Sequence, residues 1–213
     1  MSADTDGKAT TSAPPKAKEP PSPVLGTRFI EALAMAVQLH AEHSRKGSKI
    51  PYVSHLLGVA SIALEHGADE EQAIAALLHD AIEDQPRGGE TKQDILKAFG
   101  SRVLGIVEGC SDSDGQNKPS WKERKEAYVA HLRKAPAEMA LVSGADKLHN
   151  ARAILSDFRT HGPAVFDRFT AKKDGTLRYY KDLVGAFREA GNLPEGLLRE
   201  LSTTVSALES EAR

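Results

Sequence analysis

Apolar residues spaced three and four positions apart are the feature of this sequence that most restricts its fold. Between Thr27 and Glu42 they recur as one face of a helix requires, and the same period returns in later segments. We find no segment with the strict alternation of a half-buried strand, and no repeat of fixed length that would indicate a solenoid. The sequence therefore predicts an all-α fold, a compact bundle of roughly eight to ten helices.

The expected helices follow from this period and from glycine, proline and capping residues at their ends. Asp69 is the expected N-cap of the third helix, and Gly100 is expected to divide a pair of shorter helices. A polar stretch over residues 111–120 is expected to form a loop. The predicted helices cover residues 27–42, 54–65, 70–83, 91–108 in one or two pieces, 121–132, 137–158, 176–190 and 194–209.

Proline content divides the chain into parts. Five of the eleven prolines stand in the first 23 residues, among Lys, Ser, Thr and Ala, a composition that cannot bury a core. We therefore expect a disordered tail over residues 1–24 and one folded domain over residues 25–191. Residues 192–213 are expected to form an amphipathic helix that packs either on this domain or at an interface between copies. The sequence therefore does not decide between a monomer and a homo-oligomer.

Charge and cysteine content limit the partners. The formal net charge of −2 offers no excess of basic residues for a nucleic-acid polymer or an anionic membrane, and we expect neither partner. The chain has no run of about 18 apolar residues that could span a membrane.

Cys110 is the only cysteine, which excludes an intramolecular disulfide and fits a reducing compartment. We expect a cytoplasmic protein.

Four ionisable residues interrupt an apolar segment, residues 77–84 (LLHDAIED). Burying carboxylates without compensation costs several kcal/mol each, and a bound cation would supply that compensation. On an unbroken helix, His79 and Glu83 lie four residues apart, as do Asp80 and Asp84, so the two pairs would form neighbouring stripes. Imidazole with carboxylate suits Mn²⁺, Fe²⁺, Zn²⁺ or Co²⁺ better than Ca²⁺. The alternative is an exposed, charged helix face.

Two further polar residues stand within apolar helical segments, and they strengthen the metal hypothesis. His55 lies in residues 52–57 (YVSHLL), and Asp146 lies in residues 141–150 (LVSGADKLHN). Each of them alone is more often a structural residue. His40 and His43 follow the first helix, where an imidazolium would stabilise the helix C-terminus, and we expect that structural role for them.

Several short motifs, in this order, resemble those of the HD-domain phosphohydrolases. Within that family the chain is similar to the hydrolase domain of RelA/SpoT-type alarmone enzymes and to the small stand-alone alarmone hydrolases, including the metazoan SpoT homologues. The resemblance covers about residues 29–183. Its motifs are residues 45–47 (RKG), 51–55 (PYVSH), 78–84 (LHDAIED), 123–125 (ERK) and 145–150 (ADKLHN).

The resemblance implies a role for each matching residue. It implies that a single metal ion, usually Mn²⁺ in this family, is held by four ligands: His55, His79, Asp80 and Asp146. Other divalent metals stay open. Glu83 and Asp84 fall on the family's catalytic acidic pair. His149 falls on a position that is not a ligand in the family, and a structural role is expected for it.

Substrate-binding residues are implied in the same way. Arg45 matches an arginine that lies against the purine base, and Lys46 matches a lysine that contacts phosphate. Asn150 and Tyr179 match positions that line the nucleotide pocket. Trp121 departs from the pattern, because some relatives carry a basic substrate-binding residue near this position, and this leaves the base preference open.

The function that the resemblance implies is hydrolysis of a small nucleotide, the alarmone (p)ppGpp. The reaction would remove the 3′-pyrophosphate and leave GDP or GTP. Two alternatives stay open. The same chemistry could prefer (p)ppApp or another phosphorylated nucleotide such as NADPH, or the chain could be a catalytically silent module that binds the alarmone.

Overall fold

The computed structural model describes residues 24–111 and 119–213. The expected tail over residues 1–24, apart from Val24, and most of the expected loop over residues 111–120 lie outside the described residues. Within the described ranges, the chain forms ten α-helices and two short 3-10 helices, and the isolated antiparallel bridge between Ser44 and Pro51 is the one β interaction. The predicted all-α fold is confirmed.

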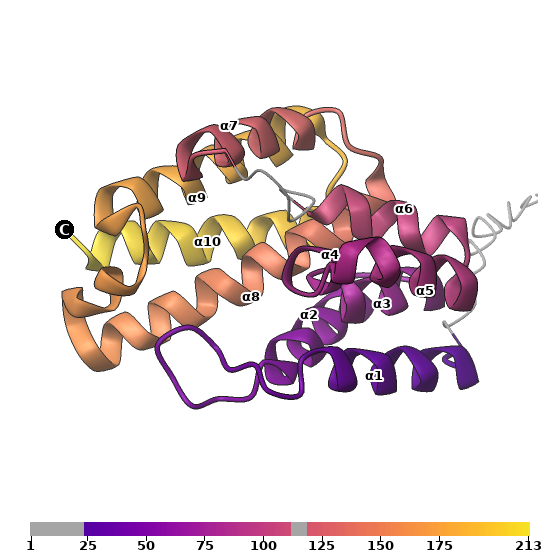
Figure 1. Ribbon diagram of the computed structural model, residues 1–213. Coiled ribbons are helices and arrows are strands. Elements are labelled where there is room, and N and C mark those ends of the chain that lie inside the picture. Colours follow the sequence, from indigo (N-terminus) through magenta and orange to yellow (C-terminus); the bar gives the residue numbers. More distant parts are fainter. Residues whose placement is uncertain (1–23, 112–118) are drawn as a thin grey trace, which may run out of the picture.

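Figure 1 shows the order of the helices along the chain and the long loop over residues 40–52 that joins the first two. The helices are α1 (Thr27–Leu39), α2 (Val53–Glu65), α3 (Glu70–Leu78), α4 (Ala81–Asp84), η1 (Arg87–Gly89), α5 (Glu90–Phe99), α6 (Ser101–Cys110), α7 (Trp121–Leu132), α8 (Ala137–His161), η2 (Gly162–Arg168), α9 (Lys172–Ala190) and α10 (Glu195–Glu211). None of the helices in the described ranges is long and apolar enough to cross a membrane.

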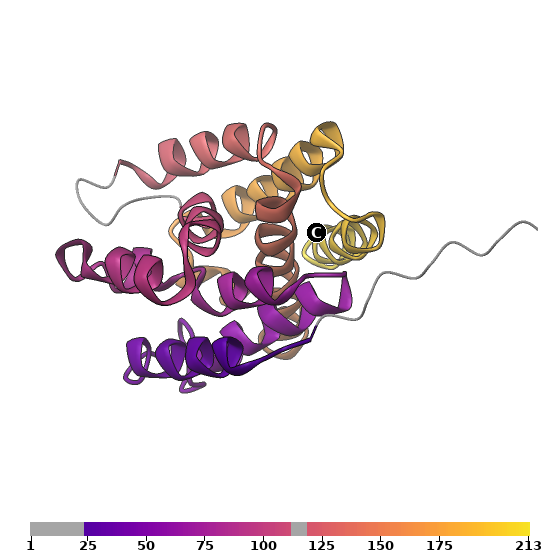
Figure 2. The ribbon, with the colours of Figure 1, turned by 90° about the vertical axis from the view of Figure 1, so that its right-hand side faces the viewer.

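The long helix α8 lies in the middle of the fold. It packs against α2, α3 and α6 on one side and against α10 on another, and Figures 1 and 2 both show it between α1 and α7. Every residue from Met139 to Asp146 on this helix is buried, because neighbours surround this part of it. A polar residue in this stretch is therefore held inside the protein.

The third helix begins as the sequence predicts. The Asp69 carboxylate accepts a hydrogen bond from the Gln72 backbone N–H, and the Gln72 side-chain oxygen accepts one from the Asp69 N–H, both at 2.9 Å. Such a capping box satisfies two N–H groups that have no partner within the helix. It fixes the start of α3, a nearly fully buried helix that leads to His79.

The predicted unbroken helix over residues 70–83 is wrong. The regular helix ends at Leu78, and α4 begins at Ala81, so His79 and Asp80 lie in the turn between the two helices. The His79 ring nitrogen Nδ1 lies 2.8 Å from the Ala76 carbonyl oxygen, the acceptor that the Asp80 N–H would use in a continuous helix. The His79 imidazole thus competes with the Asp80 N–H for the Ala76 carbonyl oxygen. The first helix also ends three residues earlier than predicted, at Leu39.

The C-terminal helix α10 packs against α8 and α9. Its buried residues recur at helical spacing: Leu197, Leu201, Val205 and Leu208. Gly144 on α8 permits the close approach, because a Cβ at this position would lie 3.2 Å from Leu197 Cδ2 on α10 and 2.5 Å from Leu193 Cδ1 just before it. The helix thereby covers one side of α8, and Glu200 Oε1 on α10 lies 3.7 Å from His66 Nε2 at the end of α2.

Candidate metal centre and active site

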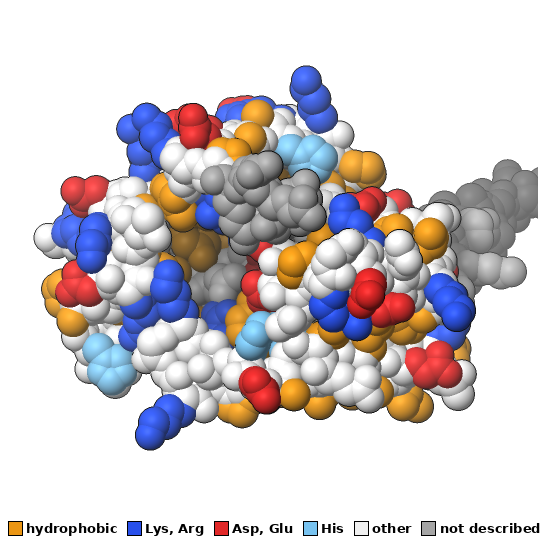
Figure 3. Space-filling model, in the orientation of Figure 1, with side chains coloured by type: hydrophobic (Ala, Val, Ile, Leu, Met, Phe, Trp, Pro, Cys, Tyr) orange, Lys and Arg blue, Asp and Glu red, His pale blue; other side chains and the backbone are white. Residues whose placement is uncertain are grey.

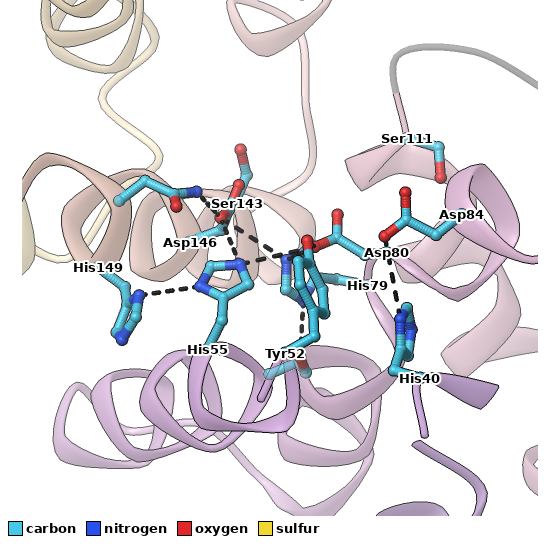
Figure 4. Close-up of polar contacts among 12 residues, drawn as sticks. His40, Tyr52, His55, His79, Asp80, Asp84, Ser111, Ser143, Asp146 and His149 are labelled. Carbon is cyan, nitrogen blue, oxygen red and sulfur yellow. Dashed lines mark hydrogen bonds and ion pairs between the residues drawn. The ribbon is translucent and has the colours of Figure 1, made fainter. Parts of the chain in front are cut away.

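Four side chains from three parts of the chain converge at one point (Figure 4). His55 comes from the start of α2, His79 and Asp80 from the turn after α3, and Asp146 from the middle of α8. His55 Nε2 lies 3.2 Å from Asp146 Oδ1 and 3.5 Å from Asp80 Oδ2. His79 Nε2 lies 3.0 Å from Asp80 Oδ2 and 3.6 Å from Asp146 Oδ1. Two imidazole nitrogens and two carboxylate oxygens therefore face a common centre.

The two imidazoles are oriented by contacts on their far sides. His79 Nδ1–H donates to the Ala76 carbonyl, and His55 Nδ1 lies 2.8 Å from His149 Nδ1. With the proton on Nδ1, each Nε2 presents a lone pair to the centre. Both Nε2 atoms are buried and have no hydrogen-bond partner among the described residues. Hydrogen bonds of this kind fix the tautomer and the orientation of histidines that bind metals.

The carboxylates are also held by neighbouring side chains. The Tyr52 hydroxyl donates to Asp80 Oδ2 at 2.6 Å. Asp146 accepts from Lys147 Nζ and from Asn150 Nδ2, each at 2.5 Å, on different oxygens. Each carboxylate is therefore fixed with an oxygen toward the common centre.

Electrostatics favours positive charge at this centre. Burial by itself raises the pKa of Asp146, but the charge of Lys147 and the facing imidazoles of His55 and His79 hold that pKa well below its usual range. The pKa of Asp80 is likewise raised by burial and lowered more strongly by His79 and His55. Burial lowers the pKa of His79, yet the negative charges of Asp80 and Asp146 bring it well above its usual value. A proton or a divalent cation can supply this charge, and the mixed donor set fits Mn²⁺, Fe²⁺, Zn²⁺ or Co²⁺.

A cavity of about 690 Å³ opens beside the four side chains. Asp80 and Asp146 form part of its wall, and a hollow with Lys and Arg side chains around it is visible on this face in Figure 3. The volume is in the range of pockets that bind small molecules. Six cationic side chains line it: Arg45, Lys46, Arg124, Lys125, Lys147 and Arg168. An anionic ligand of nucleotide size therefore suits this cavity.

The two acids next to the candidate metal centre, Glu83 and Asp84, point in different directions. Glu83 lines the cavity, and its Oε1 lies 3.7 Å from Arg124 Nη1. Asp84 Oδ2 instead lies 3.9 Å from His40 Nδ1, as Figure 4 shows. Consecutive residues leave a helix about 100° apart, which separates the two carboxylates. Of these two acids, Glu83 is the one beside the cavity.

The other predicted substrate-binding residues lie around the cavity. Arg45 Nη2 donates to Asn150 Oδ1 at 2.6 Å, and Asn150 also donates to Asp146. Lys46 stands on the same loop as Arg45 and lines the cavity. On the far wall, the Tyr179 ring meets the Trp121 ring edge to face, with centroids 5.8 Å apart. The structure thus brings all four predicted residues to one pocket, together with Trp121.

The sequence did not predict several contacts around the site. Tyr52 lies within the PYVSH segment, yet only the structure reveals its hydrogen bond to Asp80. The contact between His149 and His55 joins residues 94 positions apart. Gly58 is the sequence signal for this contact, because a glycine within a predicted helix often marks close packing. In the structure, a Cβ at this position would lie 2.3 Å from His149 Cδ2. The expected imidazolium at His40 is wrong, because burial lowers the pKa of His40 to about 4.

The comparisons with known proteins agree with this geometry. A family model described as an HD domain matches residues 32–177, more than half of the chain. The chain belongs to the HD-domain family, and its fold is that of an HD phosphohydrolase domain. The resemblance inferred from the motifs is confirmed.

Individual relatives narrow the comparison. The chain is 36% identical over 133 residues to the bifunctional (p)ppGpp synthase/hydrolase SpoT of Escherichia coli (strain K12), a match covering 60% of this chain and 18% of SpoT. It is 34% identical over 128 residues to the guanosine-3′,5′-bis(diphosphate) 3′-pyrophosphohydrolase MESH1 of Drosophila melanogaster, covering 59% of this chain and 68% of MESH1. The chain thus spans less than a fifth of the length of SpoT and about two thirds of MESH1.

A solved structure is similar over nearly the whole chain. It is that of a metazoan ortholog of SpoT described as hydrolyzing ppGpp and playing a role in starvation responses. The TM-score is 0.71 at 26% sequence identity, and the similarity covers 92% of this chain and 100% of that one. The helical arrangement described above is therefore shared with this protein.

Proposed function

We propose that this protein removes the 3′-pyrophosphate of the guanosine alarmones (p)ppGpp, with Mn²⁺ as its cofactor, and releases GDP or GTP and pyrophosphate. The observation that carries the proposal is the meeting of two imidazole and two carboxylate donors at the wall of a cavity lined by six cationic side chains. The printed names of SpoT and MESH1 support the choice of substrate.

In this proposal His55, His79, Asp80 and Asp146 hold the metal ion. When bound, a divalent cation polarises phosphoryl oxygens and lowers the pKa of a water molecule toward neutrality. The contacts from His149, Tyr52 and Lys147 keep three of these ligands in place.

Glu83 is the proposed general base. Its carboxylate lies at the cavity wall, with Oε1 3.7 Å from Arg124 Nη1. The water oxygen forms a bond to the phosphorus next to the ribose 3′ oxygen, and the bond from that phosphorus to the 3′ oxygen breaks. Glu83 takes the proton of the water and delivers it to the 3′ oxygen. Asp84 is a weaker candidate for this step, because its carboxylate faces His40.

The cationic side chains hold the two diphosphate arms of the substrate. Arg45 and Lys46 lie on one loop at the rim, and Arg45 is fixed by Asn150. Guanidinium and ammonium groups stabilise the charge that develops on phosphoryl oxygens. Tyr179 and Trp121 offer aromatic surface on the opposite wall for a purine base. Such surface accepts guanine or adenine, so (p)ppApp, and NADPH as another phosphorylated nucleotide, remain alternative substrates.

The test is a substrate panel with pure protein reloaded with Mn²⁺. Release of pyrophosphate from ppGpp and ppApp and of phosphate from NADPH is measured for the wild type, His79→Ala, Glu83→Gln and the control Glu31→Gln. We expect wild-type protein to prefer ppGpp, His79→Ala to lose metal, and Glu83→Gln to bind metal with turnover reduced roughly 10²- to 10⁴-fold. Glu31 is exposed on α1, so its substitution should leave turnover unchanged.

The outcomes separate the alternatives. A protein that binds Mn²⁺ and ppGpp but leaves the nucleotide intact would be a binding module, and the proposed activity would be wrong. Faster turnover of ppApp or NADPH would keep the chemistry and change the substrate. Full activity in Glu83→Gln would exclude Glu83 as the base.

A further inference from the structure

A second group of metal-binding side chains lies next to the candidate active site. His40 follows α1, His43 stands in the turn after it, and Asp84 ends α4. His40 Nδ1 lies 3.2 Å from His43 Nδ1 and 3.9 Å from Asp84 Oδ2, and one ligand atom from each residue lies within 4.8 Å of the others. We infer that these three side chains form a second site for a divalent transition-metal ion.

The residue types and their exposure suit such an ion. Two imidazoles and one carboxylate are ligands that Zn²⁺ and Mn²⁺ share. The His40 side chain is fully buried, His43 is half-buried and the Asp84 side chain is 35% exposed, so the group is open on one side. Water can complete the coordination from that side, as in metal sites that have three protein ligands.

Both imidazoles are held in place by further contacts. The His40 ring stacks on the Tyr52 ring, with centroids 5.0 Å apart and an angle of 21° between the ring planes. His43 Nε2 lies 2.9 Å from the side-chain amide of Gln85. The Gln85 atom facing His43 is the amide nitrogen. With its Nδ1 on a cation, His43 would donate its Nε2–H to the amide oxygen after a half-turn of that amide group, in the way that metal-binding histidines use their second nitrogen.

A simpler explanation of the short distance is a hydrogen bond between the two Nδ1 atoms. That bond would account for the 3.2 Å between the two Nδ1 atoms without a cation. A cation would instead bind ligand atoms from all three side chains, which lie within 4.8 Å of one another. The two explanations predict different numbers of bound ions.

The second site shares no ligand with the first one. Tyr52 lies between them, since its ring stacks on His40 and its hydroxyl donates to Asp80. His43 directly precedes the loop that carries Arg45 and Lys46, and Asp84 directly follows Glu83. An ion bound to both would tie that loop to α4, and thereby position a wall of the cavity. The ion would act on the proposed reaction through the position of this wall.

The test is metal content at saturation, measured by equilibrium dialysis and elemental analysis with Mn²⁺ and, separately, with Zn²⁺. The proteins are the wild type, His43→Gln, Asp84→Asn, His79→Ala and His131→Gln, a control on the exposed side of α7. We expect two ions per chain in the wild type and the control with at least one of the metals, and one ion in each of the other three. Circular dichroism shows whether each variant is folded. Two variants at the second site are used so that the site can still be tested if one of them does not fold.

A wild-type chain that binds a single ion with both metals would overturn the inference, as would two ions retained in His43→Gln and Asp84→Asn. Anomalous diffraction from crystals grown with Zn²⁺ locates the ions independently, and a second peak away from His43 would also count against the site. The result is separate from the proposed function. If the chain binds one ion and hydrolyses ppGpp, the second metal site is wrong and the proposed activity stands. If the chain binds two ions and leaves every nucleotide intact, the proposed activity is wrong and the second metal site stands.

Discussion

Alanine in place of Gly58 tests how the fold holds its candidate metal centre. Gly58 lies on α2, one turn after His55, and the His149 ring occupies the space where a side chain would begin. A Cβ would lie 2.3 Å from His149 Cδ2 and 2.4 Å from His149 Nε2, far inside van der Waals contact. The ring must therefore move away, and its contact with His55 Nδ1 is lost or distorted.

Two effects on stability oppose each other in this variant. Alanine is favoured over glycine within a helix by about 1 kcal/mol, whereas forcing a methyl group into occupied space costs about 1–3 kcal/mol. We expect a net loss of about 0–2 kcal/mol in the free energy of unfolding without metal, because the side chain of His149 can rotate. Metal binding should suffer more, since removal of the hydrogen bond behind a ligating histidine lowers affinity roughly 10- to 100-fold.

The assay combines calorimetric titration with Mn²⁺ and chemical unfolding of the metal-free protein. Gly185→Ala is the matched control: Gly185 also lies within a helix, α9, and a Cβ there meets no atom within 4 Å. The control should gain stability by about 1 kcal/mol and bind metal as the wild type does. Wild-type affinity in Gly58→Ala would refute the argument that His149 orients His55.

Further predictions concern α10 and the surface charges. Leu201→Ala, at a fully buried position of α10, should lower the free energy of unfolding by about 2–5 kcal/mol; a loss under about 1 kcal/mol in urea unfolding would show that α10 adds little to the fold. Hydrogen bonds from Arg102 and Arg28 lower the pKa of Glu71, so its contribution to stability is present above the pKa of the unfolded chain and is lost as pH falls through the folded pKa. Stability between pH 7 and about pH 3 should therefore fall less steeply in Arg102→Met than in the wild type, and equal slopes would contradict this.

Local patterns in the sequence were sufficient for the fold class. Helical spacing of apolar residues reports which face of each segment is buried, and it predicted most of the helices found in the described ranges. The Asp69 cap was predictable for the same reason, because both partners of the capping box lie within four residues. His55, His79, Asp80 and Asp146 stood out because each interrupts an apolar segment.

Tertiary structure alone decided how those residues are arranged. The contact of His149 with His55 and that of Arg45 with Asn150 join distant parts of the chain, so no local spacing encodes them. The break at His79 and the divergence of Glu83 and Asp84 depend on side chains that compete with backbone hydrogen bonds and on what surrounds each helix. The pKa of His40 falls to about 4 because the fold buries this side chain, with its ring stacked on that of Tyr52. Burial and electrostatic potential sum over all neighbours in space, and a sequence lists only neighbours along the chain.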